Sequence, residues 1–424
     1  MARTDASSLM ALFPRMVRTS LCAGLLAVAA GCASTAPSAA VPAPLPEPVA
    51  VEAPVPQVPA APPAVAQPPA APAVEAPVVP ADRLARGRLD PLDDASRGDL
   101  WVRVRSGFAM PDLDSDLVRK WEQYYAQRPD YVQRMTARGS RYLFHIVEEL
   151  ERRQMPTDLA LLPFIESAFD PQALSVARAA GMWQFMPGTG RDFELKQNLF
   201  RDDRRDILAS TRAALDYLQR LHRMFDDWHL ALAAYNWGQG NVQKALARNA
   251  RGRAGLDYPS LRMPDETRNY VPKLQAIKNI VARPESFGLV LPRLENHPYF
   301  VSVPIERDID VVLAAQLGGL TLEQFQQLNP QLNKPVILAA GTPQVLLPYD
   351  NANRFVRGLD AHQGPLASWT AWVAPRTLKP AEAARHVGMS EEELRSVNRI
   401  PAHMLVKVGS TLLVPRGAQH ADVA

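Results

Sequence analysis

Glu166 is the residue of this 424-residue chain whose surroundings point most directly to chemistry. It is the one ionisable side chain in Leu159–Phe169, where almost every other side chain is apolar. On a helix, Leu162 and Pro163 would lie one turn before it, and burial would raise the pKa of its carboxyl group. A carboxylic acid that stays protonated near neutral pH can act as a general acid. The alternative is a solvated glutamate at a helix end, which the local pattern alone favours.

Four short sequence blocks in a fixed order favour the catalytic interpretation. They are Glu166-Ser167, Gly181–Pro187, Ala234–Asn236 and Glu266–Val271. The set resembles the lytic murein transglycosylases of the soluble-lytic type, most closely their membrane-bound D group, over residues 100 to 283 and into the C-terminal region. The resemblance implies a lysozyme-like helical fold whose groove holds glycan strands of peptidoglycan.

The resemblance also implies roles for individual residues. Glu166 matches the single catalytic acid, and Ser175 matches the serine beside the C6 hydroxyl of the muramyl sugar. Tyr235 and Asn236 match the block that orients the acid. The substrate-binding residues implied in this way are Ser167, Ser175, Gln184, Met186, Tyr235, Asn236 and Tyr270. Their amide and hydroxyl groups suit sugars because they form hydrogen bonds without titrating near neutral pH.

Several of these residues have a purely structural alternative. Met186 and Tyr270, like Trp183, could equally be core residues, and Ser175 could be a turn residue after Asp170-Pro171. The sequence leaves these alternatives open.

A second carboxylate beside Glu166 would indicate a hydrolase, because ordinary glycosidases use two. Asp170 is the near candidate, but Pro171 disfavours helical geometry at Asp170, so we expect Asp170 to form a cap or turn. One acid fits the scheme that the resemblance implies. Glu166 protonates the oxygen between N-acetylmuramic acid and N-acetylglucosamine, then removes the C6 hydroxyl proton and closes a 1,6-anhydro ring. A hydrolytic muramidase and a non-catalytic peptidoglycan-binding tether remain alternatives.

Helical periodicity dominates the region that must position these residues. Apolar residues recur at helical spacing over 130–153, and Asp206 is placed to cap a helix that continues to Phe225. A further helix is expected after Asn241 as its cap, and another over 266–281, interrupted by Pro272. Strand-like alternation is nearly absent before residue 298. We therefore predict a mainly α protein, with an all-α, lysozyme-like catalytic domain over 84–290.

The C-terminal region contains an internal repeat with an offset of 69 residues. Thr321 aligns with Ser390, and Asn329 aligns with Asn398. Each copy is predicted to contain two helices and a short strand that ends in proline. The copies resemble the LysM module, a small α+β unit of βααβ topology that binds N-acetylglucosamine-containing glycans. We place a divergent module at 298–350 and a second at 368–416, with a purely structural role as the alternative to glycan binding.

The N-terminal region has the features of an exported, tethered protein. Arginines precede a ten-residue apolar run, Leu21–Ala30, which is too short to span a bilayer but suits a signal peptide over 1–31. Cys32 follows in a sequence that resembles a bacterial lipobox, and Ala33 after it implies the periplasmic face of the outer membrane of a Gram-negative bacterium. The Pro- and Ala-rich stretch 32–83 cannot form a core and is predicted to be an extended tether. A cleaved signal with no role for Cys32 is the alternative.

Composition limits the remaining function classes. The formal charge is +3, from 47 basic and 44 acidic residues, so nothing indicates nucleic-acid binding. Two cysteines exclude a disulfide framework, and no phosphate-binding loop or His-Glu-x-x-His motif is present. His145 lies on an apolar helix face and is expected in the core. We expect no metal and no cofactor, a monomer, and peptidoglycan glycan strands as the partner.

Overall fold

The structure is a computed structural model that describes residues 98–417. The predictions for the signal peptide, Cys32 and the tether lie outside these residues. Within 98–417, no helix is both long enough and apolar enough to cross a membrane.

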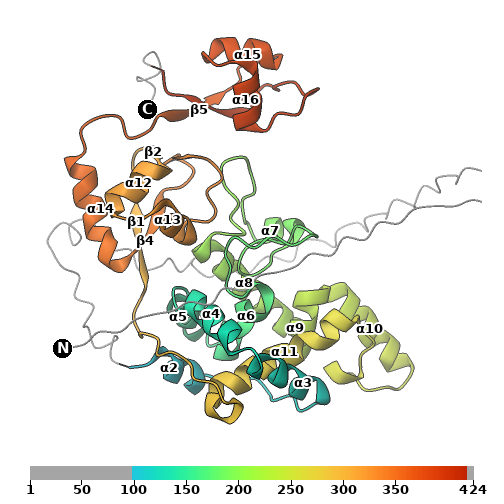
Figure 1. Cartoon of the computed structure of the whole chain (residues 1–424). Helices are drawn as coiled ribbons and strands as arrows, with labels where there is room; N and C mark the ends of the chain where they lie inside the picture. The colour runs from blue at the N-terminus through green and yellow to red at the C-terminus, as the bar shows by residue number, and fades with distance from the viewer. Residues whose placement is uncertain (1–97, 418–424) are drawn as a thin grey trace, which may run out of the picture. The chain divides into compact units, whose positions relative to one another are not determined.

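The first part of the described chain is helical, as predicted (Figure 1). Its α-helices are α2 (Leu100–Ser106), α3 (Asp116–Ala126), α4 (Pro129–Gly139), α5 (Leu143–Arg152), α6 (Leu162–Ser167), α7 (Pro187–Asp192), α8 (Ile207–Phe225), α9 (Trp228–Trp237), α10 (Gln239–Arg251) and α11 (Asp265–Ala282). Short 3-10 turns lie at η2 (Thr157–Leu161), η3 (Tyr258–Ser260) and η4 (Pro284–Phe287). One hydrophobic core joins residues from Leu100 to Leu346.

The cap predicted for α8 is confirmed. The Asp206 carboxylate accepts hydrogen bonds from the backbone N–H groups of Leu208, at 3.0 Å, and Ala209, at 2.9 Å. Two N–H groups of the first helical turn, which have no partner within the helix, thereby gain a hydrogen-bond acceptor. The apolar face of α8 then packs against α9, which carries two of the predicted site residues.

Three predicted helices differ in detail from the structure. The pattern over 130–153 forms two helices, α4 and α5, because the chain turns at residues 140–142. The helix α10 starts at Gln239 and not after Asn241, whose side chain instead donates to the Trp237 carbonyl. The helix α11 runs through Pro272 without interruption. Packing of α11 against α3, α6 and α9 outweighs the one backbone donor that the proline lacks.

The C-terminal part contains the two small α+β units that the repeat predicted. The first comprises β1 (Phe300–Pro304), β2 (Ile309–Asp310), α12 (Val311–Gly318), α13 (Leu322–Leu328), β3 (Val336–Ile337) and β4 (Gln344–Pro348), followed by α14 (Tyr349–Ala361). The second comprises β5 (Trp369–Val373), α15 (Pro380–His386), α16 (Glu391–Asn398) and β6 (Thr411–Pro415). The outer strands pair antiparallel in each unit, with Phe300 opposite Pro348 and Trp369 opposite Pro415.

The repeated positions perform the same structural task in both units. Thr321 and Ser390 each begin a helix with a capping box. The buried Asn329 side chain bonds both backbone groups of Leu346, N–H at 2.9 Å and C=O at 2.8 Å. Asn398 bonds Leu413 in the same way, at 2.7 and 3.0 Å. One asparagine therefore joins the second helix of each unit to its last strand.

We expect Asn398→Ala to destabilise the second unit by about 1–3 kcal/mol, because it leaves buried groups of Leu413 without partners. Hydrogen exchange followed by mass spectrometry should show faster exchange at 411–415, with 344–348 unchanged. Asn329→Ala is the matched control and should produce the reverse pattern. Unchanged exchange at 411–415 in Asn398→Ala would contradict this role.

Candidate active site

Glu166 lies near the end of the short helix α6. The helix stops because Ala168 and Phe169 adopt left-handed backbone conformations, with φ of 52° and 56°. Such conformations are strained for residues other than glycine. The Phe169 N–H bonds the Pro163 carbonyl at 3.1 Å, and its fully buried ring packs edge-on against Phe164, 4.6 Å between centroids. These contacts hold the strained turn that follows Glu166.

The Glu166 carboxyl group is half-buried and bonded to a tyrosine. The Tyr270 hydroxyl of α11 donates a hydrogen bond to Glu166 Oε1. Burial raises the pKa of Glu166 to about 7, and the negative charge of Glu266 adds to this rise. The Tyr270 hydrogen bond and the charge of Lys273 act in the opposite direction. With a pKa of about 7, a substantial fraction of the Glu166 carboxyl group is protonated at neutral pH.

Two tyrosines supply neutral hydroxyl groups around this acid. Burial, followed by the charge of Glu166, raises the pKa of both Tyr235 and Tyr270 well above the usual value. Both therefore remain hydrogen-bond donors. Tyr235 uses its hydroxyl on the Trp183 carbonyl, at 2.9 Å, and so joins α9 to the Gly181–Pro187 block.

Asn236 connects α9 to the first turn of α11. Its Oδ1 accepts from the Thr267 hydroxyl at 2.8 Å, and its Nδ2 donates to Glu266 Oε1 at 3.4 Å. The residue thus holds Glu266, whose charge acts on Glu166. The effect of Glu266 on Glu166 could not be predicted from the sequence, although Glu266 opens the last of the four blocks, because no local pattern links it to an acid 100 residues earlier.

The two predicted serines lie in the turns that follow α6. The Ser167 hydroxyl donates to the Met182 carbonyl at 2.9 Å and accepts from the Asp170 N–H at 3.2 Å. Ser175 is half-buried, and its Oγ accepts from the Ala179 N–H at 2.9 Å. That bond leaves the hydroxyl hydrogen of Ser175 available for another acceptor.

The Gly181–Pro187 block divides into buried and exposed side chains. Trp183 is fully buried and donates to the Thr211 hydroxyl at 3.1 Å, so it is a core residue. Met186, by contrast, is 44% exposed. Gln184 has a left-handed backbone, with φ of 51°, and its Nε2 donates to the Gly181 carbonyl at 2.8 Å. Gln184 and Met186 are therefore more exposed than Trp183 and Phe185 in the same block.

Asp170 forms a turn, as predicted. Its carboxylate accepts from the Gln172 N–H at 2.9 Å, and its carbonyl accepts from the Ala173 N–H at 3.2 Å. Glu266, and not Asp170, is the carboxylate whose charge acts on Glu166.

His145, which the sequence placed in the core, is buried there beside Phe300. Burial lowers its pKa to about 3, so the imidazole is neutral at physiological pH. It takes no part in the site around Glu166.

Comparison with known proteins agrees with this geometry. Residues 145–255 match the Transglycosylase SLT domain, residues 299–364 match the LysM-like domain of lytic transglycosylase MltD, and residues 383–415 match the LysM domain. The chain is 34% identical, over 80% of its length, to membrane-bound lytic murein transglycosylase D of Escherichia coli K12, covering 78% of that protein. The chain belongs to the membrane-bound lytic murein transglycosylase D family. It is therefore a peptidoglycan lytic transglycosylase with LysM modules.

Other relatives match shorter parts of this transglycosylase. A putative tributyltin chloride resistance protein of Alteromonas is 34% identical over 48% of the chain and 91% of that protein. A solved structure of an inactive mutant of the lytic transglycosylase Slt from Pseudomonas aeruginosa is 26% identical, with a TM-score of 0.27, over 35% of this chain and 25% of that one.

The raised pKa of Glu166 predicts a pH dependence. A general acid must be protonated to act, so with Glu166 in that role we expect kcat/KM on soluble glycan strands to fall as pH rises through about 7. Glu266→Gln removes a negative charge and should move this fall to lower pH. Tyr270→Phe removes a bond that stabilises the carboxylate and should move it to higher pH. Glu285→Gln, which replaces an exposed carboxylate, is the control and should leave the profile unchanged. Profiles of Glu266→Gln and Tyr270→Phe that both superimpose on that of the unsubstituted protein would contradict the origin given for the pKa.

Proposed function

We propose that this transglycosylase cleaves the β-1,4 bond between N-acetylmuramic acid and N-acetylglucosamine with Glu166 as its single acid and base. The observation that carries the proposal is the half-buried Glu166 carboxyl group, with a pKa near 7 and a hydrogen bond from Tyr270. A group with this pKa can give up a proton and take one back at physiological pH.

The reaction proceeds in two proton transfers. Glu166 donates its proton to the bridging oxygen while the bond from that oxygen to C1 of the muramyl sugar breaks. The Glu166 carboxylate then takes the proton of the C6 hydroxyl while O6 bonds to C1, which forms the 1,6-anhydro ring. The acid is regenerated and no water is consumed. An internal nucleophile of this kind has a large advantage in effective concentration when it is aligned.

The neighbouring residues support these steps in different ways. Ser175 donates its free hydroxyl hydrogen to the substrate near the C6 oxygen, while Gln184 and Met186 contact the sugars. Tyr270 orients the Glu166 carboxyl group through its hydrogen bond. The other residues that the resemblance placed among the substrate-binding set bond the protein itself and act by positioning it. Their bonds join Ser167 to Met182, Tyr235 to Trp183, and Asn236 to Thr267.

We expect Glu166→Gln to lower glycan cleavage by about 10³-fold or more, because an amide cannot transfer the proton. Glycan binding and the folded structure should be retained, since the amide oxygen can still accept from Tyr270. Cleavage assays and pull-down with peptidoglycan measure the two effects, with Glu285→Gln as the matched control. Substantial turnover by the Glu166→Gln variant would disprove the role of Glu166.

The alternative enzyme is a hydrolytic muramidase, which would use a second carboxylate. Glu266 is the candidate for that carboxylate, because its negative charge acts on Glu166. Digestion in heavy-oxygen water separates the two reactions. We expect 1,6-anhydro ends without label, as detected by mass spectrometry. Stoichiometric label at the new muramyl C1 would mean that water is the nucleophile.

We also propose that the enzyme is a monomer, bound through acylated Cys32 to the periplasmic face of the outer membrane. The lipobox-like sequence supports the anchor, and the E. coli relative is named membrane-bound. We further propose that the two LysM modules extend over 298–350 and 368–416 and that both bind glycan strands. The tether over 32–83 would let the catalytic domain, over 84–290, reach the wall.

Cys32→Ser should release the protein from the membrane fraction into the periplasm, because the acyl chain can no longer be attached. Fractionation followed by immunoblotting measures this change. Cys22→Ser provides the matched control, since it replaces the other cysteine of the chain and should leave the fractionation unchanged. A Cys32→Ser variant that still fractionates with membranes would contradict the anchor.

A further inference from the structure

Arg204 is a buried arginine outside the four blocks that identified the site. Its side chain, just before α8, belongs to a residue that is 7% exposed. Its guanidinium group makes a bidentate pair with the Asp202 carboxylate, Nε to Oδ1 at 2.9 Å and Nη2 to Oδ2 at 2.7 Å. The pair neutralises the charge and fixes the plane of the guanidinium group.

The third guanidinium nitrogen of Arg204, Nη1, faces two backbone carbonyls of the candidate site. Nη1 donates to the carbonyl of Arg178 at 2.7 Å and to that of Phe185 at 3.2 Å. Arg178 closes the turn that starts at Ser175, through a 2.9 Å backbone bond. Phe185 lies between Gln184 and Met186. One side chain therefore joins the Ser175 turn to the Gln184 turn.

The backbone of Arg204 contacts the same block. Gly181 has a φ of +82°, and a Cβ atom there would lie 2.0 Å from the Arg204 carbonyl oxygen. No side chain fits in this space, so the block packs directly on the chain at Arg204. The contact is independent of the hydrogen bonds made by the guanidinium group.

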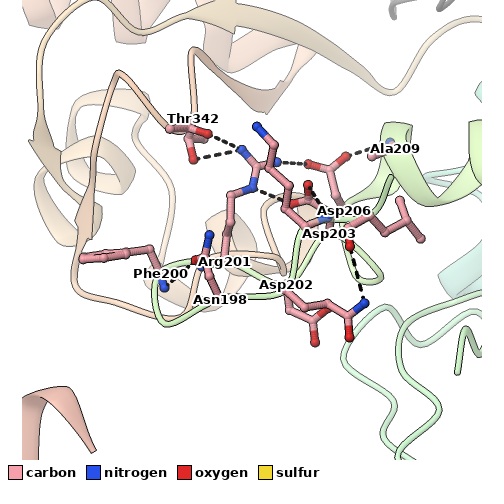
Figure 2. Close-up of polar contacts among 12 residues, drawn as sticks. Asn198, Phe200, Arg201, Asp202, Asp203, Asp206, Ala209 and Thr342 are labelled. Atoms are coloured by element: carbon pink, nitrogen blue, oxygen red, sulfur yellow. Dashed lines mark hydrogen bonds and ion pairs between the residues drawn. The ribbon is translucent and has the colours of Figure 1, made fainter. Parts of the chain in front are cut away.

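The segment that carries Arg204 is itself fixed by other contacts. Figure 2 shows Arg201 between the carboxylates of Asp203 and Asp206 and the hydroxyl of Thr342. The Asp202 N–H also donates to the Gln331 carbonyl at 2.9 Å. Asp206, in turn, caps α8. The arginine therefore extends from an anchored segment.

We propose that Arg204 is a positioning residue for the transglycosylase reaction, which sets the distance between the Ser175 turn and the Gln184–Met186 turn. The proposal rests on the substrate contacts proposed for those residues. Arginine suits the task because its rigid fork serves one carboxylate and two carbonyls together. A lysine ammonium group is a point donor and lacks this geometry.

Arg204→Gln and Arg204→Lys test the proposal in the full-length protein. We expect both to lower kcat/KM on soluble glycan strands by at least about tenfold, the size of a modest loss of alignment. The pH at which activity falls should stay unchanged, because Arg204 is not among the groups that shift the pKa of Glu166. Arg191→Gln, an exposed arginine of α7, should behave like the unsubstituted protein.

Hydrogen exchange without substrate gives a readout that does not depend on the proposed chemistry. In Arg204→Gln we expect faster exchange over 175–186 and unchanged exchange over 207–225. Wild-type exchange over 175–186, or wild-type kcat/KM in the folded variant, would overturn the proposal. Failure of the proposed chemistry would instead appear as cleavage by Glu166→Gln, which leaves this exchange result unaffected.

Asp202→Asn is a second variant that tests the same proposal if Arg204→Gln does not fold. It leaves the arginine in place but removes the carboxylate that orients it. We expect a smaller loss of kcat/KM in the same direction, with faster exchange over 175–186. Wild-type values of both quantities in Asp202→Asn would overturn the proposal.

Discussion

The hydrogen bond between Tyr270 and Glu166, made where burial disfavours the carboxylate, is the interaction on which the rest of the site depends. Burial raises the pKa of the carboxyl group, whereas the tyrosine hydroxyl and Lys273 stabilise the charged form. The balance places the pKa near 7, where one group can act as both acid and base. The long helix α11 supplies Tyr270, Lys273 and Glu266, and its continuous course through Pro272 carries all three on one element.

Strained backbone conformations occur on both segments that carry site residues, after Glu166 and within the Gly181–Pro187 block. Ala168, Phe169 and Gln184 all have positive φ, which costs on the order of 1 kcal/mol or more at each non-glycine residue. The buried rings of Phe169 and Trp183 and the pair of Arg204 with Asp202 stabilise these turns. The strained turns and their supports come from separate segments of the chain, so the site forms only when the helical domain is packed.

The sequence predicted the helical class, the cap at Asp206 and the two repeated α+β units because each depends on local patterns. The second unit has the predicted βααβ topology, whereas the first also contains the β2–β3 pair. It also identified Glu166 as the candidate acid from its apolar neighbours. The uninterrupted helix through Pro272 and the contribution of Glu266 could not be predicted, because both follow from packing between distant segments. The link from Arg204 to the site could not be predicted for the same reason, since it runs to the backbone carbonyls of Arg178 and Phe185, which leave no pattern in the sequence.

The pKa of Glu166 is the quantity that tests the central claim most directly. Carbon-13 NMR of the glutamate side-chain carboxyl groups, compared between the unsubstituted protein and Glu166→Gln, isolates the titration of this one group without substrate. We expect a midpoint of about 7. A midpoint near the ordinary glutamate value of about 4.3 would contradict the claim that burial holds Glu166 protonated for catalysis.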